Sequence, residues 1–196
     1  MLPDDVLLEI FHFCVDPSED TNKGIEAWQT LVQVCRLWRT VVFGSPCRLN
    51  LRLVCTPTTP ARDLLDIWPA LPIAIRGGYH HSIENIDNVV AALECSSRVR
   101  QIDFTNVFES ELAMEKLLAE MQVPFPELTR LILQPDEKMV LPDSFLGGSA
   151  PRLQYLQLNG ISYPGLPKLL LSATHLTDLH LTFLILDTFH PRHSQH

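Results

Sequence analysis

The sequence has few of the features that mark membrane proteins, nucleic-acid-binding proteins and common enzymes. No apolar run approaches the roughly 18 to 20 residues that span a bilayer. Basic residues are scarce, since 15 Lys and Arg stand against 23 Asp and Glu, for a net charge of -8. This balance argues against nucleic acid or an anionic membrane surface as the main partner. GxSxG, HExxH and a phosphate-binding glycine loop are absent too, which favours a non-enzymatic protein.

Cysteine is present but shows no metal or redox pattern, because no CxxC pair occurs. The five cysteines are odd in number and widely spaced: Cys14, Cys35, Cys47, Cys55 and Cys95. Cys14 and Cys35 fall within apolar helical patterns. We therefore expect reduced, buried thiols, which is typical of intracellular proteins. Apolar surroundings would raise the pKa of such thiols and disfavour a nucleophilic role.

The histidines do not form a metal-ligand pattern either. His80 and His81 follow two glycines and are interpreted as an exposed turn. His190, His193 and His196 have no carboxylate or thiol framework beside them, so we interpret them as part of a disordered tail. No metal and no cofactor is expected.

The composition is that of a folded chain. A hydrophobic fraction of 46% with 19% charged residues is sufficient to fill a core. Met1 is followed almost at once by Pro3, Asp4 and Asp5 rather than by a basic and then apolar leader, so we expect a cytoplasmic or nuclear location.

Apolar residues before residue 48 recur with the period of a helix. The segment Leu2 to Val15 has Pro3 near its start and acidic residues where a helix N-terminus favours negative charge. On a helical wheel its apolar side chains cover an arc of about 220°, wider than the stripe of a little over 100° that one contact surface needs. The surplus predicts a second apolar partner, either the rest of this chain or another protein.

Helical spacing resumes after a polar loop at 16–25. Trp28, Leu31, Val32 and Cys35 follow one another at i, i+3, i+4 and i+7, and the pattern ends at Gly44 to Pro46. Two or three short helices are therefore predicted before residue 47. About 45 residues bury too little surface to be stable alone.

These helical segments carry a family resemblance. The opening LPDDVLLEIF and the later LVQVCRLWRTVVFGSP occur in order and together resemble the F-box motif, with VCRLWR at Val34 to Arg39 as the most specific part. The match covers Leu2 to about Pro46. The loop from Val15 to Ile25 is longer than the usual short turn, as in many fungal F-box-like sequences.

The resemblance implies docking onto the Skp-type adaptor of an SCF (cullin-RING) ubiquitin ligase. By position in the motif, the adaptor contacts would be Leu2, Pro3, Leu7, Ile10, Phe11, Val34, Cys35 and Trp38. Wheel geometry does not divide these residues between the chain's own core and a partner. The alternative is that they form only the core of a helical cap on the remainder of the chain.

The remainder of the chain repeats the pattern LxxLxL. Copies begin at Val99, Leu128, Leu153 and Leu176, in steps of 29, 25 and 23 residues, which fit the range of leucine-rich repeats. A weaker copy is Trp68, Leu71 and Ile73, and LNLRL at Leu49 to Leu53 is a candidate first strand. The expected fold class is α/β, with an F-box-like helical domain at 1–47, a short, irregular leucine-rich-repeat solenoid with a parallel sheet at 48–186, and a disordered tail at 187–196.

Helices are predicted between these strands. Thr59 and Pro60 would start a helix that ends at Ile67, Ser82 would cap Ile83 to Cys95, and Ser110 would cap Glu111 to Met121. Gly165 to Ser172, interrupted by Pro167, is predicted as a single turn. The positions that usually hold Asn or Cys are Val107, Asp136 and Ile161, so the repeats are degenerate. No capping unit follows the last copy, which favours a truncated array.

The positions between the leucines would face a protein target on the concave side of the sheet. They are Arg100, Gln101, Asp103, Thr129, Arg130, Ile132, Gln154, Tyr155, Gln157, Thr177, Asp178 and His180. Four further basic residues, Arg36, Arg39, Arg48 and Arg52, are explained either by solvation and ion pairs or by a phosphate-reading pocket. We therefore expect a substrate adaptor of a ubiquitin ligase. The alternative is a leucine-rich-repeat binding module without ligase function, whose helices act as an N-terminal cap.

Overall fold

The computed structural model describes residues 2–15, 27–46, 48–77, 86–105, 111–135 and 138–182. Several of the predictions above concern residues outside these described ranges. They are the polar loop, Cys47, the pair His80 and His81, the two caps at Ser82 and Ser110, the degenerate positions Val107 and Asp136, and the C-terminal tail with its three histidines.

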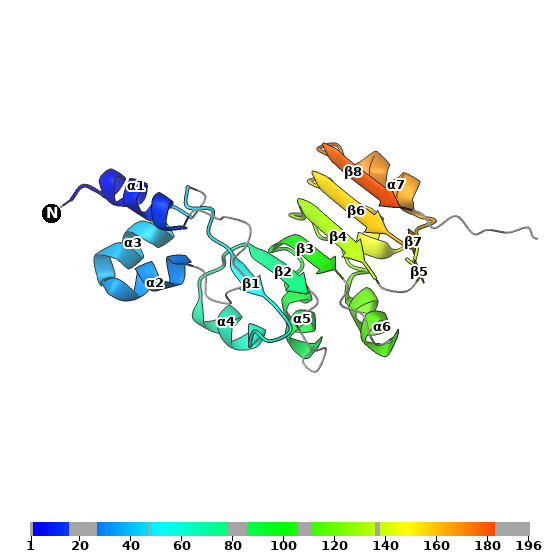
Figure 1. Ribbon diagram of the computed structural model, residues 1–196, viewed down its shortest axis with the longest axis horizontal. Coiled ribbons are helices and arrows are strands. Elements are labelled where there is room, and N and C mark those ends of the chain that lie inside the picture. Colours follow the sequence, from blue (N-terminus) through cyan, green and yellow to red (C-terminus); the bar gives the residue numbers. More distant parts are fainter. Residues whose placement is uncertain are drawn as a thin grey trace, which may run out of the picture.

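Three helices pack together at one end of the molecule (Figure 1): α1 (Asp4–Val15), α2 (Ala27–Val34) and α3 (Arg36–Gly44). Helix α1 begins after Pro3, whose carbonyl accepts hydrogen bonds from the backbone N–H groups of Val6 and Leu7. One apolar face of each helix points inward, so the three share a core. Its helical members are Leu7, Leu8, Phe11, Trp28, Leu31, Val32, Val41 and Val42.

A six-stranded parallel sheet follows, and its strands lie side by side in the order in which the chain forms them. They are β1 (Leu53–Cys55), β2 (Ile73–Gly77), β3 (Val99–Thr105), β4 (Arg130–Gln134), β6 (Tyr155–Asn159) and β8 (Asp178–Thr182). The fold is therefore mixed α/β with a mostly parallel sheet, as the sequence predicts. A second, two-stranded sheet pairs β5 (Met139–Val140) with β7 (Ile161–Ser162).

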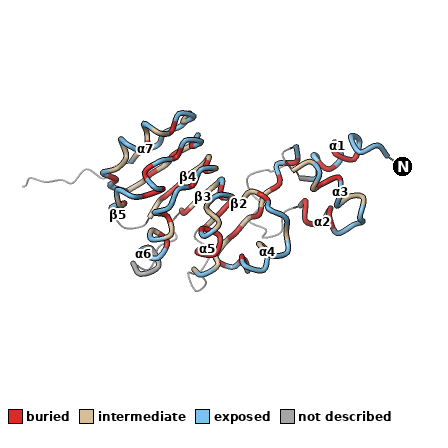
Figure 2. The backbone as a smooth tube through the Cα atoms, turned by 180° about the vertical axis from the view of Figure 1, so that it is seen from behind, coloured by how far each residue is buried: buried red, intermediate tan, exposed pale blue. Residues whose placement is uncertain are grey.

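The connecting segments cover one face of the large sheet. Helices α4 (Ala61–Ile67), α5 (Ile86–Leu93), α6 (Glu111–Glu120) and α7 (Leu166–Ser172), with the short 3-10 helix η2 (Phe145–Gly148), form a single hydrophobic core with that face. Figure 2 shows the buried residues gathered along the strands and the inner sides of these segments. The other face carries no helix in the described part of the chain and is called the open face below.

The repeated leucines align across the strands. Ile102, Leu131, Leu156 and Leu179 are register partners in successive strands, and so are Phe104, Leu133, Leu158 and Leu181. Both rows point into the helix-covered core, although Leu179 in the last strand is partly exposed. The strands predicted for the four LxxLxL copies are thus present and in register.

The two weaker strand predictions are wrong in their details. The segment from Leu49 does not extend as a strand, because Asn50 adopts a positive φ of 48° within a turn, and β1 begins only at Leu53. In β2 the partner of Ile102 is Ile75, not Leu71. The register shifts between Ile73 and Ala74. The residues of β2 that align with the core rows are therefore closer together in the sequence than the leucines of LxxLxL.

Two helix predictions also need correction. The Thr59 hydroxyl bonds to Thr56 rather than capping α4, and Pro60 occupies the N-cap position without a side-chain bond. The segment Gly165 to Ser172 forms a seven-residue helix rather than a single turn. Pro167 lies in its first turn, where a missing N–H costs no helical hydrogen bond.

The helical end and the sheet share a second hydrophobic core. Trp28 of α2 contacts Phe43 of α3 and Trp68 after α4, with ring centroids 6.1 Å and 5.1 Å away. Its indole Nε1–H donates to the backbone carbonyl of Arg52 at 3.1 Å. Leu49, Leu51, Leu53 and Leu71 belong to the same core. The helices therefore complete their core with residues from beyond the predicted boundary at 47.

Replacing Trp28 with Ala should destabilise this joint strongly. The side chain is fully buried, so its removal leaves a cavity and deletes an indole hydrogen bond. We expect a loss of about 3 to 5 kcal/mol in the free energy of unfolding, measured by urea denaturation. The control is Ile67→Ala at an exposed position of α4, which should change it by less than about 0.5 kcal/mol. A Trp28→Ala effect no larger than that of the control would contradict the shared core.

Candidate functional site

Helix α1 has two apolar faces, and only one is covered by the chain. Leu7, Leu8 and Phe11 are buried in the helical core. Val6, Ile10 and Phe13 are spaced i, i+4 and i+7, lie on a different side and are 42%, 43% and 81% exposed. The wide apolar arc of this helix thus divides into a core face and an exposed stripe. The stripe of Val6, Ile10 and Phe13 is called the α1 stripe below.

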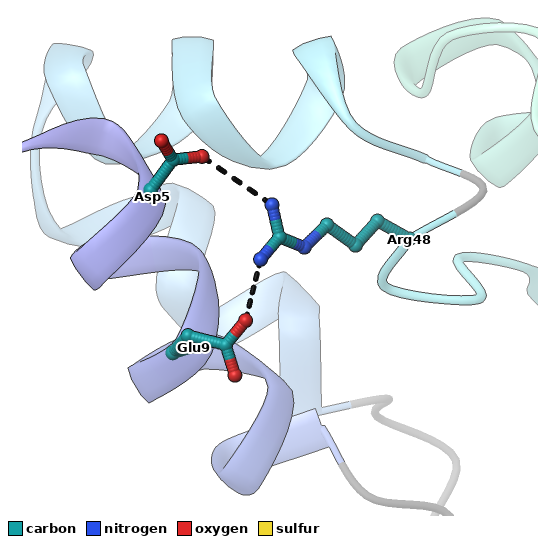
Figure 3. Close-up of polar contacts among 3 residues, drawn as sticks. All are labelled: Asp5, Glu9 and Arg48. Atoms are coloured by element: carbon teal, nitrogen blue, oxygen red, sulfur yellow. Dashed lines mark hydrogen bonds and ion pairs between the residues drawn. The ribbon is translucent and has the colours of Figure 1, made fainter.

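The third side of α1 is polar and is held by an ion pair (Figure 3). Arg48 reaches back from the turn after α3, with its Nη2 2.5 Å from Glu9 Oε1 and its Nη1 3.4 Å from Asp5 Oδ1. The hydrogen bond to Glu9 raises the pKa of Arg48 above its ordinary value. The chain's own contacts on α1 therefore lie on the core face and on this polar side.

The other arginines of the predicted basic cluster point to different contacts. Arg39 Nε donates to the Val32 carbonyl, and Arg52 Nη1 donates to Gln101 Oε1 on β3. Arg48 is occupied by two carboxylates, as the ion-pair interpretation expects. These contacts do not converge on one phosphate-sized site.

The predicted adaptor contacts separate into core and surface positions. Leu7 and Phe11 are buried by the chain itself, so they are not available to a partner. Trp38 is half-buried, with its ring 4.8 Å from that of Phe11. The remaining five, Leu2, Pro3, Ile10, Val34 and Cys35, are exposed. Val6 and Phe13 were not predicted, although their spacing from Ile10 marks them as one face.

The cysteines do not all behave as buried thiols. Cys55 is fully buried and Cys95 is half-buried, but Cys14 and Cys35 are exposed, which corrects the prediction for those two. Cys14 follows Phe13 on α1, away from its buried face, and Cys35 occupies the break between α2 and α3. An apolar neighbourhood in the sequence did not mean burial, because both residues lie at helix ends.

The open face gathers the predicted target-binding residues into rows. Gln101, Arg130, Tyr155 and Asp178 are register partners in four successive strands. The next row contains Asp103, Ile132, Gln157 and His180, together with Arg76 of β2. A third row, Thr105, Gln134, Asn159 and Thr182, was not predicted, although the alternation of strand side chains places it on the same face.

Three members of these rows stack on one another. The Arg130 guanidinium lies 4.1 Å from the centre of the Tyr155 ring, and the His180 ring lies 5.4 Å beyond it. The Tyr155 hydroxyl is 2.8 Å from Gln157 Oε1, which accepts its hydrogen bond and fixes the ring. Cation–π contact of this kind orients an arginine without occupying its N–H groups.

The remaining predicted residues have mainly local roles. Thr129 and Thr177 donate their hydroxyls to the carbonyls of Arg100 and Gln154 in the preceding repeats. Arg100 lies 3.9 Å from Glu127 in an ion pair. Gln154 is exposed, and Ile132 is buried at the centre of the open face.

Two adjoining depressions flank the start of the strands. The larger, of about 400 Å³, lies between the turn at Asn50 and the segments before β2, β3 and β4, and includes Arg98 and Arg100. The smaller, of about 120 Å³, shares Arg100 with it and continues onto the open face beside Arg52, Ala74 and Gln101. Sequence spacing gave no signal for either, because their walls combine turn residues with the first residues of strands from different parts of the chain.

The described residues contain no group of three or more His, Cys, Asp or Glu arranged to hold a metal ion. Within the same ranges, no helix has both the length and the apolar character needed to cross a bilayer. Comparisons with protein-family models, curated proteins and solved structures find no match to this chain.

The buried thiol of Cys55 should make stability depend on alkaline pH. Burial raises its pKa from 9.0 to about 11, with a smaller contribution from Cys95. Between these values the unfolded chain has lost a proton that the folded protein retains, so the free energy of unfolding falls as pH rises through this window. Below pH 9.0 the contribution is fully present. We expect a loss of about 2 to 3 kcal/mol by about pH 11 in urea denaturation.

A Cys55→Ala variant provides the control for this measurement. It cannot titrate at this position, so its stability should decline less steeply over the same pH range, whatever its stability at neutral pH. In native protein, iodoacetamide should modify Cys14 and Cys35 well before Cys55, as seen by peptide mass spectrometry. Equal pH slopes for the two proteins would show that the buried thiol is not the cause.

Proposed function

We propose that this chain is a substrate adaptor of an SCF-type (cullin-RING) ubiquitin ligase. The F-box-like helices would dock onto the Skp-type adaptor, and the leucine-rich-repeat segment would hold a protein target on the open face. The α1 stripe is the observation that carries this proposal. Three large apolar side chains on one exposed helix face are what an apolar partner surface would cover.

The resemblance and the stripe agree in position. The stripe lies in the first part of the segment from Leu2 to about Pro46 that resembles the F-box motif. Val6 and Ile10 belong to LPDDVLLEIF, and Phe13 follows it by two residues. Exposed Val34 and Cys35 lie at the start of VCRLWR, its most specific part. Leu7 and Phe11 leave the proposed contact set, and Val6 and Phe13 replace them.

Such an adaptor requires no catalytic group of its own. Holding a target beside the transferring subunits raises the effective concentration of the reacting groups. The open face supplies a surface of arginine, amide, aromatic and imidazole groups, which suits recognition of a protein. Ubiquitin transfer itself would belong to the other subunits.

The second candidate is a binding module whose helices only cap the repeats. The shared core of Trp28, Phe43 and Trp68 favours this role, because the helices cover the apolar surface at the start of the sheet. Capping and docking are compatible in one structure. The cap-only function, however, assigns no role to the α1 stripe.

The double variant Ile10→Asp with Phe13→Asp tests the docking surface. Both side chains are exposed, so the fold should survive, while two charges enter the proposed interface. We expect affinity for the purified Skp-type adaptor to fall by at least about 100-fold, because central apolar contacts each contribute about 2 kcal/mol or more. Co-purification and calorimetry would measure this loss.

The matched control is Ile67→Asp with Leu171→Asp, which adds the same two charges at positions that are 69% and 85% exposed on α4 and α7. This variant should bind the adaptor as the wild type does. Unchanged binding by the Ile10 and Phe13 variant, with the same urea unfolding midpoint as wild type, would refute docking through the stripe and leave the cap-only function. Loss of binding in both variants would show that the stripe is not specific.

A further inference from the structure

The open face contains two arginines that no carboxylate of the described residues neutralises. Arg76 and Arg130 are half-buried, and within the described residues neither guanidinium has a hydrogen-bond acceptor or an ion pair. Arg48, Arg62, Arg100 and Arg152, in contrast, all pair with carboxylates. A cation that is partly removed from water without a partner is a preferred site for an anion.

The surroundings of the two arginines differ. The register partner of Arg76 is Asp103, a carboxylate on the neighbouring strand. The partners of Arg130 are Gln101 on one side and Tyr155 on the other, both uncharged. The Arg130 guanidinium carbon also lies over the Tyr155 ring, 4.1 Å from its centre, so this contact positions the guanidinium. Among the described residues, Arg130 is therefore a cation of this face that an aromatic ring orients and whose N–H groups have no acceptor.

We infer that the open face binds an extended acidic peptide segment of the target, with an Asp or Glu carboxylate on Arg130. The planar guanidinium of an arginine presents a fork of N–H groups that matches a carboxylate in bidentate geometry. This inference rests on the proposed function and specifies the chemistry of its target.

Charge and distance favour a carboxylate over a phosphate group. A phosphoryl group carries about two negative charges and is usually bound by a cluster of arginines. Arg76 and Arg130 lie two strands and one row apart, about 12 Å at the usual spacing of strands and residues. A single guanidinium whose register partners are uncharged matches the single charge of a carboxylate.

The face also sets the direction and length of such a peptide. Arg52 and Arg100 line the small depression beside β1 to β3, whereas Asp178 lies on β8 at the other edge. The acidic residue therefore belongs over β3 and β4, and an uncharged residue over Tyr155 and His180. Crossing from β1 to β8 covers about 24 Å, or about seven extended residues.

Fluorescein-labelled heptapeptide pools, random except for a fixed central residue, would test this inference on the full chain without ligase subunits. The central residue is Glu, Gln, phosphoserine or Lys, and fluorescence anisotropy measures binding. We expect the Glu pool to bind at least about tenfold more tightly than the Gln and Lys pools. Arg130→Gln should abolish this preference, whereas Arg130→Lys should retain part of it because the charge remains but the fork is lost.

Three further variants separate a direct role from a general effect. Tyr155→Phe keeps the ring beneath Arg130 and should keep the Glu preference, whereas Tyr155→Leu should reduce it. Arg62→Gln on α4 removes an arginine away from the open face and should leave it unchanged. The inference is overturned by equal binding of the Glu and Gln pools, by a Glu preference that survives Arg130→Gln, or by tenfold tighter binding of the phosphoserine pool. Loss of adaptor docking would leave these results unaffected, so the two proposals fail separately.

Discussion

The alignment of apolar side chains across the parallel strands determines the rest of this structure. Ile75, Ile102, Leu131, Leu156 and Leu179 form one row, and burial of the first four against the helices holds their strands in register. Because successive strand side chains point to opposite faces, fixing this row also fixes the residues beside it. The open face therefore follows from the packing of the core. Arg130 lies beside Tyr155 because Leu131 lies beside Leu156.

The same principle explains why the helical end keeps an exposed apolar stripe. Burying Leu7 and Phe11 against α2 and α3 places Val6, Ile10 and Phe13 on another side of α1. Arg48 occupies the polar side through Glu9 and Asp5. The stripe thus stays exposed because three short helices pack onto the first strand of the sheet with the other apolar side of α1 facing inward.

Much of this arrangement can be predicted from the sequence, because it depends on periodicity. The LxxLxL spacing locates four strands, and alternation identifies the residues of the open face. The division of the α1 arc between core and surface cannot be predicted in this way, because it depends on where Trp28 and Trp38 place the neighbouring helices. Local backbone geometry cannot be predicted from the sequence pattern either. The register shift at Ile73 and the positive φ of Asn50 move strand boundaries without any change in composition.

The shared core has a consequence for how the two surfaces work together. Trp28 and Trp68 connect the helices to the first part of the sheet through side chains rather than through a linker. The α1 stripe and the open face are therefore held on one continuous structure, with α1 at one end and β8 near the other (Figure 1). Under the proposed function, the position of a bound target relative to the ligase would be set by this packing. A connection through packed side chains would orient the target for transfer, whereas a flexible linker would only raise its concentration.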